Sequence, residues 1–103
     1  MYVMYQPQAY SFIVRPGAER VIATCTLFGP GGVTVQLRSP TKTYTEADLK
    51  IYENTIISVV PALTYQYVKK ATATITPPTG METWTLLLTF STAVPYQVGI
   101  EVY

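Results

Sequence analysis

Hydrophobic and polar residues alternate along most of this chain. In the clearest run, residues 83–90, every second position is apolar: Trp84, Leu86, Leu88 and Phe90. A period of two places alternate side chains on opposite faces of a β-strand, and no window of twelve or more residues holds a helical stripe. We therefore predict an all-β protein in which residues 83–90 form the central strand of the core.

Strand-like patterning recurs along the whole chain, and segments rich in proline and glycine separate most of the runs. The predicted strands are residues 2–5, 9–14, 20–28, 33–38, 55–60, 65–68, 71–76, 83–90 and 96–103. Many short strands at roughly ten-residue spacing are typical of an antiparallel two-sheet β-sandwich. We predict one such domain of about eight to nine strands over residues 1–103, with jelly-roll or another Greek-key order left open.

The middle of the chain carries weaker patterns. Residues 45–48 have the form of a helix-capping segment, and we expect at most one helical turn after it. The run 55–60 is mostly apolar, so we expect a strand that is covered on both faces. Lys69 and Lys70 interrupt the apolar pattern and are expected to form a turn or to guard a sheet edge.

The first eight residues are strand-like and are separated from the next strand by Pro7. They are expected to form an edge strand of their own sheet or to pair with the sheet of a neighbouring subunit. Tyr2 and Tyr5 are therefore candidate interaction residues. This segment lacks the basic start and apolar core of a signal peptide, and no apolar run approaches the ~20 residues that span a bilayer, so membrane insertion is not expected.

Charge is scarce in this protein. Only 13% of the residues are charged, about half of the roughly 25% typical of globular domains, and threonines alternate with apolar residues in many strands. A neutral, β-branched outer face avoids the desolvation cost of burying charges when subunits pack together. The seven basic residues are spread along the sequence, which gives no sign of a nucleic-acid partner.

Most of the side chains that carry catalysis or bind cofactors are missing. The chain has no histidine, and its single cysteine, Cys25, lies in phase with Val21, Ala23 and Leu27, as expected of a buried residue. The turn at 29–32 is rich in glycine but lacks the lysine and hydroxyl residue of a phosphate-binding loop. We predict no catalytic residue, no cofactor and no enzymatic activity.

Three acids lie close together in sequence, namely Glu46, Asp48 and Glu53. Carboxylates and loop carbonyls are ligands that Ca²⁺ accepts, so these residues are a candidate calcium site. A pair of carboxylates also performs the acid and base steps of some hydrolases. Because Lys42 and Lys50 lie among the acids, the pattern favours a solvated loop face over either site.

Tyr65 and Tyr67 are two positions apart and therefore share one face of a strand. That face is expected to bind either carbohydrate or a second subunit. Tyr52 and Trp84 are further candidates for stacking on a sugar, although the alternation around Trp84 favours the core.

The leading hypothesis is a non-enzymatic structural subunit of a virion or virus-like particle: a capsid, decoration, turret or fibre component. Such a protein acts through contacts with its own copies or with other structural proteins, and its expected location is the virion or an extracellular surface. The alternative is a cell-surface binding module for carbohydrate or a protein partner. A small hydrolase that uses Glu46, Asp48 or Glu53 is a third option.

Overall fold

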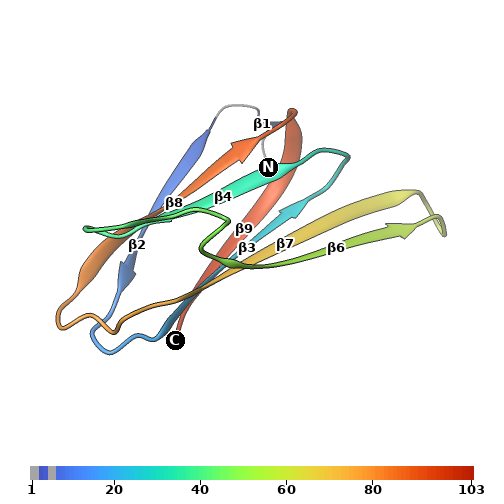
Figure 1. Ribbon diagram of the computed structural model, residues 1–103. Helices are drawn as coiled ribbons and strands as arrows, with labels where there is room; N and C mark the ends of the chain where they lie inside the picture. The colour runs from blue at the N-terminus through green and yellow to red at the C-terminus, as the bar shows by residue number, and fades with distance from the viewer. Residues whose placement is uncertain (1–2, 5–6) are drawn as a thin grey trace.

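The computed structural model describes residues 3–4 and 7–103 and places their strands in two sheets (Figure 1). Within these ranges there is no helix. The strands are β1 (Val3–Met4), β2 (Gln8–Val14), β3 (Arg20–Leu27), β4 (Val33–Arg38), β5 (Thr43–Tyr44), β6 (Lys50–Ser58), β7 (Thr64–Thr74), β8 (Glu82–Phe90) and β9 (Val94–Val102).

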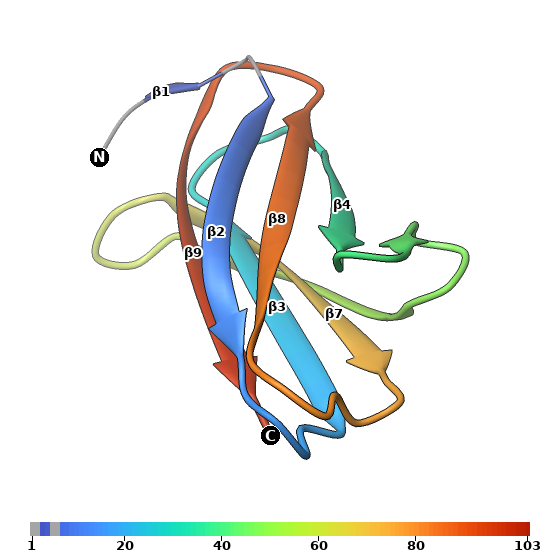
Figure 2. The same cartoon turned by 90° about the vertical axis from the view of Figure 1, so that its left-hand side faces the viewer.

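The first sheet has the order β1-β9-β3-β7-β6, the second has the order β2-β8-β4-β5, and all neighbours are antiparallel. Among the described strands, only β4–β5 and β6–β7 are hairpins within one sheet. The other connections from β2 onward pass between the sheets, and Figure 2 shows β2 and β8 lying across β3 and β9. The predicted all-β, antiparallel two-sheet sandwich is confirmed, whereas a jelly-roll order is not confirmed.

The core lies between the two sheets and follows the predicted alternation. Strand β8 is central in its sheet, between β2 and β4, and its four predicted core residues from Trp84 to Phe90 are buried. On the facing sheet, β3 contributes Val21, Ala23, Cys25 and Leu27, all of them buried. The period of two in the sequence therefore identified the inner faces of both central strands correctly.

Residues 45–48 form a turn and no helix follows. The Asp48 carboxylate accepts hydrogen bonds from the backbone N–H and the hydroxyl of Thr45, at 3.0 and 3.2 Å. The Asp48 N–H donates to the Thr45 carbonyl at 2.9 Å. Of the two reciprocal capping contacts, only the one from the Thr45 N–H to the acid is present; it closes a tight turn, and β6 begins directly afterwards at Lys50.

Two expectations for the middle of the chain are wrong. Residues 65–68 and 71–76 do not form separate strands, because β7 runs through Lys69 and Lys70 without a turn. The run 55–60 is not covered on both faces: all of its residues except Ser58 are exposed. The physical reason is that β6 is the edge strand of its sheet and extends beyond the facing sheet.

The β6–β7 hairpin extends beyond the other strands of its sheet. Strand β3 pairs with β7 only between Thr74 and Tyr67, so within the described part of the chain residues 56–66 pair only with each other. We call residues 56–66 the arm; it projects from the sandwich in Figure 1. The molecule is accordingly elongated, measuring 50 × 24 × 24 Å, with a radius of gyration of 14.7 Å, against about 13 Å for a compact domain of this size.

The N-terminal strand β1 pairs with β9 of the same chain, with Val3 opposite Pro95 and Met4 opposite Val94. In this chain it is therefore an edge strand of the first sheet. The candidate interaction residues Tyr2 and Tyr5 lie outside the described residues.

The burial pattern of β8 yields a stability prediction. Leu86→Ala removes a fully buried side chain and should lower the free energy of unfolding by about 3 kcal/mol. Leu87→Ala, on the opposite face of the same strand, should cost less than about 1 kcal/mol. Urea denaturation measures both values, and equal losses would contradict the assigned inner face.

Candidate functional site

The arm presents a group of exposed aliphatic side chains. Ile56, Ile57, Val59, Val60 and Leu63 are between 49% and 78% exposed. No charged residue occurs anywhere from Asn54 to Val68. Groups of exposed apolar side chains mark interaction sites in soluble proteins, whereas single exposed apolar residues are common. The arm is therefore the strongest candidate for a functional surface.

The register of the hairpin sorts the arm into two faces. Ile57 lies opposite Tyr65, and Thr55 lies opposite Tyr67, so these four residues share the face that is directed toward the second sheet at the base of the hairpin. Ile56 and Gln66 form a pair on the other face. Tyr65 and Tyr67 are both half-buried and do share a face, as their spacing implies.

The outer edge of β6 is open, because no strand in the described part of the chain pairs with it. Natural proteins commonly protect such edges with charged residues or proline. The charges of β6, Lys50 and Glu53, lie in its first half, and Asn54–Ser58 has neither a charge nor a proline. This second half of the edge is therefore open to pairing with another strand.

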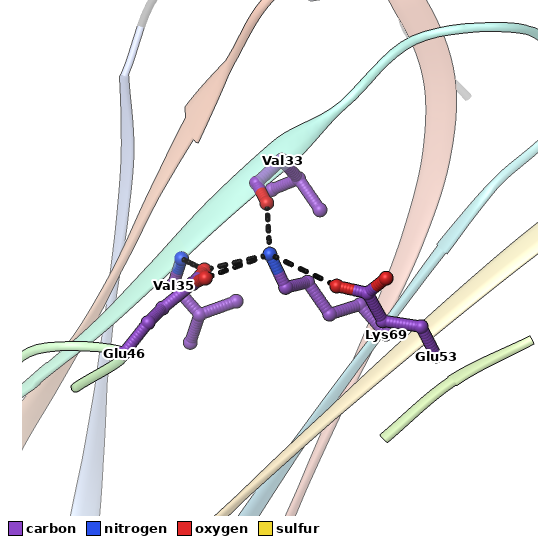
Figure 3. Close-up of polar contacts among 5 residues, drawn as sticks. All are labelled: Val33, Val35, Glu46, Glu53 and Lys69. Carbon is purple, nitrogen blue, oxygen red and sulfur yellow. Dashed lines mark hydrogen bonds and ion pairs between the residues drawn. The ribbon is translucent and has the colours of Figure 1, made fainter. Parts of the chain in front are cut away.

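A buried ion pair lies at the base of the hairpin (Figure 3). Lys69 is only 6% exposed, and its Nζ donates to the Val33 carbonyl at 2.7 Å. The same nitrogen is 2.8 Å from Glu46 Oε2, with Glu53 Oε1 more distant at 3.9 Å. Glu46 also accepts the Val35 N–H at 2.7 Å, so one carboxylate links β4 to β7.

This cluster marks the position where the facing sheet ends. Val33 is the first residue of β4, and Glu46 follows β5, so nothing in either strand lies further toward the arm. The next inward-facing residue of β7 is Tyr67. Burial, together with the charge of Glu53 and a hydrogen bond to it, raises the pKa of Tyr67 to about 12. The shift reflects the partly covered position of Tyr67 beside Glu53 at the base of the arm.

The three acids proposed for calcium binding or hydrolysis are not brought together. Glu46 and Glu53 both face the Lys69 ammonium, whereas Asp48 closes the 45–48 turn. Among the described residues, no group of three or more histidine, cysteine, aspartate or glutamate side chains is arranged to hold a metal ion. The lysine that neutralises Glu46 comes from β7, far away in sequence, and the acidic spacing gave no sign of it.

Trp84, a candidate for sugar stacking, and Cys25, predicted to be buried, both belong to the core. Trp84 is 2% exposed, its indole N–H donates to Glu82 at 2.9 Å, and its ring stacks on Tyr44 with centroids 5.5 Å apart. It therefore offers no open face to a sugar. Cys25 is also buried, and burial raises the pKa of its thiol to about 11. Tyr52, by contrast, is 58% exposed on the outer face of the first sheet.

Comparisons of the chain with models of known protein families, with curated proteins and with solved structures gave no match. No helix long and apolar enough to cross a membrane occurs in the described residues.

Lys69 and Lys70 provide a matched pair for testing the buried cluster. Lys69→Ala leaves Glu46 and the Val33 carbonyl without their partner and should lower the free energy of unfolding by about 3 kcal/mol. Lys70→Ala, at the next and exposed position, should change it by no more than about 0.5 kcal/mol. Urea denaturation distinguishes the two, and comparable losses would show that the Lys69 contacts are not what stabilises the base of the hairpin.

The raised pKa of Cys25 predicts an inert thiol. Only the thiolate reacts with iodoacetamide, and a thiol with a pKa of about 11 is almost wholly protonated at mildly alkaline pH. We expect no alkylation of the native protein and complete alkylation in denaturant, measured by intact mass. Rapid labelling of the folded protein would contradict the buried position.

Proposed function

We propose that this protein is a non-enzymatic structural subunit that assembles with further copies of itself through the arm and the open edge of β6. The observation that supports the proposal is the uncharged arm, which carries five exposed aliphatic side chains beyond the end of the facing sheet. Such a surface lowers solubility in a protein that remains alone, and its burial against a neighbour is favourable.

A second copy is the partner that suits this edge. Two copies of β6 related by a two-fold axis can pair antiparallel, which joins their sheets into one. If the pairing is centred within Asn54–Ser58, the paired segments contain no charge, and no like charges are opposed. The aliphatic side chains of both arms, Ile56 and Ile57 among them, then meet across the axis.

The proposed setting is a virion or virus-like particle, in which many identical subunits pack side by side. The low charge of the chain supports this setting, because neutral strand faces are packed together at a small desolvation cost. No catalytic role is assigned: Glu46 and Glu53 contact Lys69, and Asp48 holds a turn.

Ile57→Lys tests the interface. The substitution places a charge on the apolar arm and, in a two-fold interface, brings it near its own copy. We expect the wild-type protein to form dimers or larger species at micromolar concentration and the variant to dissociate at least about tenfold more readily. Sedimentation velocity over a concentration series measures both. Ile13→Lys, at a comparably exposed position on β2, is the matched control and should leave assembly unchanged.

Three outcomes would overturn the proposal. A wild-type protein that stays monomeric at every concentration excludes self-assembly. Equal weakening by Ile13→Lys and Ile57→Lys excludes the arm as the specific contact. Binding of a monomer to phospholipid vesicles that only Ile57→Lys abolishes would assign the arm to a membrane surface.

A further inference from the structure

The outer face of the first sheet contains a second surface feature, separate from the arm. It is an open hollow of about 350 Å³ lined by Arg20, Ile22, Lys50, Tyr52, Lys70 and Thr72. Strands β3, β7 and β6 each contribute two of these residues. Ile22 forms a largely covered part of the lining, at 7% exposure, whereas Tyr52 is 58% exposed.

The strand register explains why the surface is hollow here. Thr72 of β7 lies opposite Ile22 of β3 on one side and Lys50 of β6 on the other. On the same face, Lys70 lies opposite Tyr52. A short threonine is thus surrounded by long side chains, which leave a depression between them.

Half of the lining residues are cationic, and none is acidic. In the part of the chain that the structure describes, every ion pair involves Lys69, so Arg20, Lys50 and Lys70 have no carboxylate within 4.0 Å. Arg20 instead lies over the Tyr103 ring, at 5.2 Å from its centroid. Glu101 is an acid on the same face, opposite Ile22 on β9, and it accepts a hydrogen bond from the Tyr103 hydroxyl. The three cations of the lining outnumber this neighbouring acid, so the hollow favours anions.

The combination of groups indicates the class of ligand. Lysine and arginine side chains bind sulfate and phosphate groups, and the Thr72 hydroxyl can donate a further hydrogen bond. The exposed ring of Tyr52 offers a flat apolar face beside the three cations. A sugar has one such flat face of C–H groups, and an ester group on it supplies the negative charge.

We propose that this hollow binds an anionic saccharide, one that carries sulfate or phosphate ester groups. The cations hold the ester group, and Tyr52 packs against the sugar ring. The site uses only Lys50 and Tyr52 of β6, which precede the Asn54–Ser58 segment proposed for self-assembly, so the two sites share no residue. The three cations are far apart in sequence and meet only through the strand register.

A matched pair of double variants tests the proposal. Lys50→Gln with Lys70→Gln removes two charges from the hollow, whereas Arg38→Gln with Lys42→Gln removes two charges from the other sheet. Isothermal titration calorimetry at low salt uses a heparin-derived hexasaccharide as the sulfated probe and a mannose 6-phosphate oligosaccharide as the phosphorylated probe. Neutral dextran is the control ligand, and circular dichroism checks the fold of each variant.

We expect one of the two anionic probes to bind and dextran not to bind. The first double variant should lower the affinity about tenfold, and the second less than about twofold. Tyr52→Ala should lower the affinity for the saccharide but leave the weak binding of inorganic sulfate or phosphate unchanged, and Tyr52→Phe should retain both. The probe that binds identifies the ester.

Absence of binding by both anionic probes would overturn the proposal. Equal losses in the two double variants would show general attraction to the whole molecule. Equally tight binding of a single-stranded oligonucleotide of the same charge, insensitive to Tyr52→Ala, would show a site for any polyanion.

Discussion

The buried ammonium of Lys69 defines where the two sheets stop covering one another. It is held by the Val33 carbonyl and by Glu46, which lie at the end of the second sheet. On the far side of this contact, β6 and β7 continue without a facing sheet, and beyond Tyr67 they also lack β3 as a neighbour. An unpaired charge at this depth is costly, so the ion pair fixes the position from which the arm projects.

The exposed arm follows from this geometry. A hairpin outside the sandwich has no core to enter, yet its sequence is as apolar as that of a buried strand. The apolar side chains of the arm stay exposed after folding, so covering them with a second protein surface lowers the free energy. The structural role that we propose requires only this exposed apolar surface and no reactive side chain.

Strands with one face in the core and the other in solvent could be predicted well, because the alternation of apolar and polar residues indicates which face is buried. The bounds of β4 match the predicted residues 33–38, and β8 was placed correctly at the centre of its sheet. Alternation does not report how far the facing sheet extends, so the exposure of residues 55–60 was missed. The pattern predicted a turn or an edge guard at Lys69, whose burial the sequence does not indicate because its partner Glu46 is far away in sequence. The absence of charge from Asn54 to Val68 was the available signal for the arm.

The central claim is that Asn54–Ser58 of β6 pairs with another copy. Amide hydrogen exchange measured across a concentration series tests it most directly, because an open strand edge exchanges rapidly and a paired one is protected. The account predicts that protection within Asn54–Ser58 rises with the assembled fraction, while the amides of β2, an edge strand of the other sheet, stay unchanged. Assembly without added protection in Asn54–Ser58 would contradict it.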